Sequence, residues 1–155
     1  MIRFTPGIEC HTHEYIRTGS FDSKFGFGIE YLSTLFKAIS NTKHLKLIGL
    51  HAHIGSQIFE LEPHKDLGGI MVNVILDAKK FGHNIKELNV GGGLGTKYIE
   101  EDDPPSIDEW IKTVSVSVTK ACQANNLPLP KLMCEPGRSI VSTAGVTIYL
   151  SLIHI

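Results

Sequence analysis

Residues 47–57, Leu-Ile-Gly-Leu-His-Ala-His-Ile-Gly-Ser-Gln, form the stretch that decides the fold. Alternate side chains of a β-strand share a face, so one face of this stretch would be wholly apolar, with Ile48, Leu50, Ala52 and Ile54. His51 and His53 would share the opposite face. Imidazoles are poor core filler, so that face is expected to line a cavity, although either ring could instead be hydrogen-bonded inside the core. Gly55 and Ser56 follow as a turn able to hold an anion.

Three further strands are predicted outward from this one, at residues 2–8, 87–90 and 131–134. Helical periodicity predicts helices at residues 29–40 and 63–81. A third helix is predicted to begin at the capping box of Ser106 and Glu109, although its valines also alternate as in a strand. Its expected apolar face comprises Ile107, Trp110, Ile111, Val114, Val118 and Ala121.

The spacing of these elements predicts a parallel α/β fold. Strand ends recur roughly every 40 residues, which indicates about four βα units joined by right-handed crossovers. Either an open doubly wound sheet or a partial (β/α)₈ TIM barrel would result, and a complete barrel needs about 250 residues. A β-prone run at residues 140–149 is expected to be a strand leaving the barrel.

Composition limits the class of protein. The chain has 155 residues, 42% of them hydrophobic, and a formal charge of -1, which suits one globular domain and does not favour nucleic acid or a membrane as a partner. Cys10, Cys122 and Cys134 have no Cys-x-x-Cys spacing, which argues against a disulfide framework or structural zinc. No apolar run suits a secretory leader or a membrane span, so a cytoplasmic protein is expected.

Polar or glycine-rich residues follow every predicted strand, at the edge where parallel α/β folds build their sites. Residues 91–95, Gly-Gly-Gly-Leu-Gly, let backbone N–H groups approach a phosphate, although a tight turn without a ligand is the alternative. Thr96 stands where a dinucleotide-binding motif needs glycine. The polar loop at residues 9–26, with His11 and His13, is long enough to contribute to a site, but its histidines are more typical of plain surface residues.

Glu135 follows the last strand and should share a face with Met133, away from Leu132 and Cys134. Its carboxylate could hydrogen-bond a protonated ring nitrogen. Arg138 offers a two-pronged donor for a substrate carboxylate. An internal ion pair between the two residues is the alternative.

Four segments together resemble a known family: Lys-Phe-Gly at 24–26, His-Ala-His-Ile-Gly-Ser-Gln at 51–57, Gly-Gly-Gly-Leu-Gly at 91–95 and Glu-Pro-Gly-Arg-Ser at 135–139. In order and spacing they resemble the barrel domain of diaminopimelate decarboxylases, which belong to the pyridoxal-phosphate-dependent, alanine-racemase-like barrel group. The resemblance extends to about residue 149. Ornithine and arginine decarboxylases share much of this frame, but Gln57, the Leu-Gly at 94–95 and Ser139 look more like the diaminopimelate enzymes.

The resemblance implies a site for pyridoxal 5′-phosphate. His53 would stack on the pyridine ring, and Glu135 would pair with its nitrogen. The phosphate would be held by Ser56, Gly91, Gly92, Gly93, Gly137 and Arg138. Arg138 would also bind a carboxylate of the amino-acid substrate. The intact enzyme, a homodimer, would convert meso-2,6-diaminopimelate to L-lysine with loss of carbon dioxide; it would be cytoplasmic, or located in the plastid stroma if eukaryotic.

One departure from the family concerns the lysine that forms a Schiff base with the cofactor. The family carries it on a first barrel strand that precedes the matched segment, and no lysine of this chain occupies that position. The chain as given is therefore expected to be inactive. Residues 1–139 are interpreted as a partial cofactor-binding barrel domain and residues 140–155 as the exit toward an absent C-terminal β domain.

Three other functions are compatible with parts of the pattern. His51 and His53 could be zinc ligands of a metal-dependent hydrolase, but the neighbouring strand ends supply glycines, Glu135 and Arg138 in place of further histidines or aspartates. A non-enzymatic pyridoxal-phosphate carrier and an ornithine- or arginine-type decarboxylase are the other two.

Overall fold

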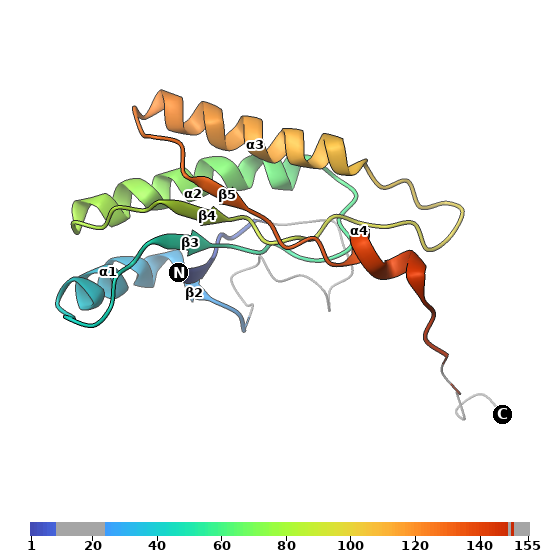
Figure 1. Cartoon of the computed structure of the whole chain (residues 1–155), viewed down its shortest axis with the longest axis horizontal. Coiled ribbons are helices and arrows are strands. Elements are labelled where there is room, and N and C mark those ends of the chain that lie inside the picture. Colours follow the sequence, from blue (N-terminus) through green and yellow to red (C-terminus); the bar gives the residue numbers. More distant parts are fainter. Residues whose placement is uncertain (9–23, 149, 151–155) are drawn as a thin grey trace.

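The computed structural model describes residues 1–8, 24–148 and 150. All strands of its five-stranded sheet are parallel (Figure 1): β1 (Ile2–Thr5), β2 (Phe27–Gly28), β3 (Gly49–His51), β4 (Glu87–Asn89) and β5 (Lys131–Met133). The helices are α1 (Leu32–Ser40), α2 (Glu62–Lys80), α3 (Ile107–Ala124) and α4 (Arg138–Val141), with 3₁₀ turns η2 (Ile29–Tyr31) and η3 (Ser142–Ala144). The four predicted strands and three predicted long helices are confirmed.

Strand order decides between the two expected architectures. The sheet runs β2-β1-β3-β4-β5, so the strands from β1 through β5 lie in chain order apart from the two-residue β2. Right-handed crossovers that always step in the same direction place their helices on one face of the sheet, whereas a doubly wound sheet reverses direction. The arrangement is that of a partial barrel, with α2 and α3 packed side by side outside the strands (Figure 1).

Parallel register sorts the strand residues into two rows. One row joins four apolar residues across the sheet, namely Ile2, Leu50, Leu88 and Leu132. The first three are buried in the core with the inner faces of the helices. The next row lies on the opposite face and contains Arg3, His51, Asn89 and Met133. Polar side chains therefore gather on the face that a closed barrel turns inward.

The helices pack their predicted apolar faces on the first row. In α2 the buried residues include Met71, Val74, Ile75 and Ala78, and Gly82, with φ +83°, follows its end. The Ser106–Glu109 capping box begins α3, and Trp110, Val114 and Val118 of that helix are buried. Two predicted core residues are instead exposed. Ile107 occupies the first position of α3, and Ile48 precedes β3.

The prediction of a strand at residues 140–149 is wrong over its first half, because α4 and η3 occupy residues 138–144. Residues 145–148 and 150 have no regular structure. The polar loop predicted at residues 9–26 lies outside the described residues except for residues 24–26. Within the described ranges, no helix has the length and apolar character that crossing a membrane requires.

Candidate functional site

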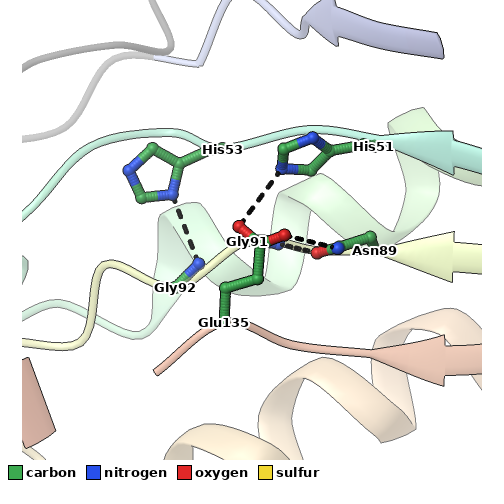
Figure 2. A network of polar contacts seen from close by, with 6 residues as sticks. All are labelled: His51, His53, Asn89, Gly91, Gly92 and Glu135. Carbon is green, nitrogen blue, oxygen red and sulfur yellow. Dashed lines mark hydrogen bonds and ion pairs between the residues drawn. The ribbon is translucent and has the colours of Figure 1, made fainter. Parts of the chain in front are cut away.

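The polar row of the sheet continues past the strand ends. His53, Gly91 and Glu135 each follow a member of that row, His51, Asn89 and Met133, by two residues. Figure 2 shows that Glu135 reaches from the end of β5 toward Asn89 and His51, with His53 beside them. The expectation that His53 and Glu135 share one edge of the sheet agrees with this arrangement.

Asn89 connects the other groups at this edge through hydrogen bonds, and the residue is only 7% exposed. Its Nδ2 donates to Glu135 Oε1 at 2.7 Å, and its Oδ1 accepts from the backbone N–H of Gly91 at 2.9 Å. The backbone N–H of Glu135 donates to the Gly91 carbonyl at 2.7 Å. Both ends of the Asn89 amide are therefore used, which fixes the glycine turn and the Glu135 carboxylate relative to each other.

His53 is bound to the glycine turn through its ring. The backbone N–H of Gly92 donates to His53 Nδ1 at 3.2 Å (Figure 2). An accepting nitrogen carries no proton, so the neutral ring has its proton on Nε2. Burial lowers the pKa of His53, and the nearby positive charge of Arg3 lowers it further. The ring is therefore neutral at physiological pH.

His51 faces Glu135 more loosely. Its Nε2 lies 3.7 Å from Glu135 Oε2, beyond hydrogen-bond distance, and this buried nitrogen has no hydrogen-bond partner in the described part of the chain. Burial lowers the pKa of His51 by more than the carboxylate of Glu135 raises it. The Glu135 side chain is 56% exposed, so one face of its carboxylate remains open to a further donor.

The glycine turn brings three backbones together. A Cβ on Gly92 would overlap the carbonyl oxygen of Glu135. Gly93 has φ +109°, and a Cβ there would lie 2.6 Å from the carbonyl oxygen of Gly55. A glycine is required at each position, because a side chain would push the loop after β4 away from its neighbours on both sides.

The remaining predicted site residues lie on the loops that flank this turn. Ser56 is half-buried directly after Gly55. Gly137 caps α4, and Arg138 is the first residue of that helix. The positive charge of Arg138 contributes to lowering the pKa of His53, which places the guanidinium in the same electrostatic environment as the imidazole.

Sequence reasoning missed Arg3 and Asn89. Arg3 pairs in register with His51, and its guanidinium lies 4.9 Å from the ring centre of Phe25. Both residues could have been found from the sequence, because each is a polar residue inside an otherwise apolar strand. Each alternates with core residues, so its side chain points to the face opposite the core. Among the described residues, no group of three or more His, Cys, Asp or Glu could hold a metal ion.

Comparison with known proteins identifies the family. Residues 1–142 match the family described as pyridoxal-dependent decarboxylase, pyridoxal binding domain. The diaminopimelate decarboxylase of Synechocystis is 56% identical over 149 residues, which are 96% of this chain and 32% of that protein. The diaminopimelate decarboxylase of Staphylococcus aureus is 40% identical over 151 residues, covering 96% of this chain and 35% of the relative.

A solved structure agrees with the sequence comparison. The crystal structure of diaminopimelate decarboxylase from Helicobacter pylori complexed with L-lysine has a TM-score of 0.78 and 29% identity, over 90% of this chain and 33% of the other. The chain thus spans about a third of the length of these relatives. On the match over residues 1–142, the chain belongs to the pyridoxal-dependent decarboxylase family and carries sequence of its pyridoxal binding domain.

Proposed function

We propose that this chain supplies part of the cofactor-binding barrel of a diaminopimelate decarboxylase, which releases carbon dioxide from meso-2,6-diaminopimelate and leaves L-lysine. The 56% identity with the Synechocystis enzyme supports this substrate over other basic amino acids. The observation that carries the proposal is the hydrogen-bonded cluster of His53, Asn89, Gly91, Gly92 and Glu135 at one sheet edge.

The donors and acceptors at this edge fit pyridoxal 5′-phosphate. A carboxylate suits a protonated pyridine nitrogen, and a neutral imidazole suits the face of an aromatic ring. The glycine turn lets a phosphate come close to the backbone, although the N–H groups of Gly91 and Gly92 already donate to Asn89 Oδ1 and His53 Nδ1. The buried Nε2 of the partly buried His51 lies at the same edge and has no hydrogen-bond partner among the described residues. When bound, this cofactor supplies an electron sink for the negative charge left when carbon dioxide departs.

Glu135 would hold a proton on the pyridine nitrogen. Its Oε1 is already engaged by Asn89, which leaves Oε2 as the acceptor for that proton. His53 would cover one face of the ring in its neutral form, which burial maintains. Ser56, the three glycines at 91–93 and the turn at Gly137 would surround the phosphate.

Arg138 would bind both the phosphate and a substrate carboxylate. Arg138 is the first residue of α4, and the paired N–H donors of a guanidinium match the oxygens of an anion. Its positive charge is one of the causes that lower the pKa of His53, which is consistent with a role at the same sheet edge. We propose in addition that the intact protein is a homodimer.

A chimeric enzyme tests the substrate. This chain would replace the matching third of the Synechocystis diaminopimelate decarboxylase, and carbon dioxide release would be measured with meso-diaminopimelate, ornithine and arginine. We expect activity with meso-diaminopimelate alone. Activity with ornithine or arginine in its place would contradict the proposal and assign the chain to the related decarboxylases.

Arg138→Ala in the same chimera tests the role of that residue. Losing a charged hydrogen-bonding partner of the substrate should raise KM about tenfold or more. The Kd for pyridoxal 5′-phosphate should change less, because other groups also surround the phosphate. Lys131→Ala, which removes an exposed cation at the opposite end of β5, is the control. Loss of the cofactor with an unchanged KM would refute the assignment of Arg138.

A further inference from the structure

The amide side chain of Gln57 binds the backbone of the neighbouring loop. Its Nε2 donates to the Thr96 carbonyl at 2.6 Å, and its Oε1 accepts from the Thr96 N–H at 3.2 Å. Both polar atoms of one side chain thus pair with both polar groups of one residue, as a neighbouring strand would do. Gln57 also has φ +58°, which is uncommon for a residue other than glycine.

These two bonds extend a short parallel contact between the loops after β3 and β4. The Ile58 N–H donates to the Gly93 carbonyl and the Gly95 N–H to the Ile58 carbonyl, both at 2.9 Å. The isolated bridge between Ile58 and Leu94 has the same parallel sense. The loop that carries Ser56 is therefore hydrogen-bonded to the glycine turn through both backbone groups of Ile58.

Thr96 connects a third loop to the same point. Ser142 Oγ donates to Thr96 Oγ1 at 2.9 Å, and Ser142 begins the 3₁₀ turn that directly follows α4. The helix α4 starts at Arg138, after the cap at Gly137. Gln57, Thr96 and Ser142 thus form a chain of hydrogen bonds, which we name the loop clasp, across the three loops proposed to surround the phosphate.

We infer that Gln57 is a positioning residue for the cofactor phosphate, which acts through the loop clasp and does not itself contact the phosphate. The inference rests on the proposed function of the site. Phosphate recognition by several backbone N–H groups needs the loops at fixed separations, because each donor must lie within hydrogen-bond distance of one small anion. A chain without the clasp would retain the pyridine-binding groups Glu135 and His53 but lose selectivity for the phosphorylated ligand.

Pyridoxine 5′-phosphate and pyridoxine are suitable probes, because both lack the aldehyde that reacts with surface lysines. Equilibrium dialysis of each against the chain gives a selectivity ratio, the Kd for pyridoxine divided by the Kd for pyridoxine 5′-phosphate. Gln57→Ala and Gln57→Gly both remove the amide, but glycine accepts a φ of +58° without strain. Gln123→Ala, the same type of change at an exposed position of α3, is the control.

We expect the selectivity ratio to fall about tenfold in both Gln57 variants, as two hydrogen bonds are lost, and to stay unchanged in Gln123→Ala. Amide hydrogen exchange measured by NMR should accelerate at Thr96 while amides of α2 keep their protection. Ser142→Ala is a milder change at the other end of the loop clasp and should lower the selectivity ratio by about fivefold. This variant replaces the Gln57 variants in the test if they fail to fold.

The outcomes separate this inference from the proposed function. A wild-type chain that binds both probes equally would overturn the phosphate site and the inference with it. A wild-type preference for pyridoxine 5′-phosphate that survives in Gln57→Gly would leave the site standing and overturn the inference, because Gln57 would then serve only to turn the backbone. An unchanged ratio in Ser142→Ala would also count against the clasp.

Discussion

A buried histidine of α2 provides the sharpest test of the folded structure. His64 is 1% exposed, and neither ring nitrogen has a hydrogen-bond partner in the parts of the chain that the structure describes. Its ring meets that of Trp110 edge-on, with 5.7 Å between the centroids, and the indole Nε1 is equally unpartnered. Protonation of His64 would therefore place a charge in the core beside no acceptor.

The magnitude follows from the pKa of this imidazole. Burial, with a smaller effect from His53, lowers the pKa of His64 from 6.5 to about 4. Below 6.5 the unfolded chain binds a proton that the folded chain takes up only near pH 4, so the free energy of unfolding falls as the pH drops through this window. From pH 7.5 to pH 4.5 this linkage lowers the free energy of unfolding by about 2.5 kcal/mol.

His64→Leu should remove this component of the pH dependence, because leucine has a similar volume and does not titrate. Urea unfolding followed by the fluorescence of Trp110, the one tryptophan in the sequence, would give the free energy of unfolding at both pH values. We expect the wild-type chain to lose about 2.5 kcal/mol more than the variant between pH 7.5 and 4.5. His44→Leu, at an exposed histidine, is the control for losing one imidazole.

Parallel pH profiles for the wild type and His64→Leu would refute the reasoning. That result would mean that the imidazole of His64 is solvated or hydrogen-bonded in the folded chain. Greater stability of the variant at pH 7.5 is also expected, because burying two unpaired ring nitrogens costs more than the edge contact with Trp110 contributes.

Three further substitutions have defined outcomes. Ser106→Ala removes the hydroxyl that accepts from the Glu109 N–H in the capping box of α3, and should lower the free energy of unfolding by about 1 kcal/mol in urea titrations. Gly69→Ala adds a Cβ where nothing lies within 4 Å and should raise the same quantity by about 1 kcal/mol through helix propensity. Gly92→Ala instead forces a Cβ against the Glu135 carbonyl, and should cost about 1–3 kcal/mol and reduce pyridoxine 5′-phosphate binding measured by dialysis.

Hydrophobic periodicity predicted most of the fold because each long element has one buried face. The failures have local causes. The two residues of β2 are too few to show any period. Ile140 and Val141 have strand-like side chains, but they are 67% and 63% exposed, and β propensity largely reflects packing against neighbours that these residues do not have.

The candidate site was predictable to the extent that it depends on parity within one strand. The two-residue step from His51 to His53, or from Met133 to Glu135, fixes a face without knowledge of the neighbouring strands. The role of Asn89 depends instead on the register between strands, and the role of Gln57 on a turn with positive φ. The register is set by contacts between residues about 40 positions apart, and a positive φ is uncommon for a residue other than glycine, so local sequence predicts neither.

The alternation of polar and apolar side chains along each strand also restricts which rearrangements of the site are possible. A slip of one residue in β3 or β5 would exchange the two faces, turning His53 or Glu135 toward the helices and an apolar side chain toward the cluster. The apolar row that continues through Leu50 and Ala52, both fully buried, opposes such a slip with the hydrophobic effect of the entire core. The polar cluster at the sheet edge is thus held in place mainly by apolar side chains on the opposite face of the strands, and Asn89 and Gln57 complete the positioning with a few hydrogen bonds.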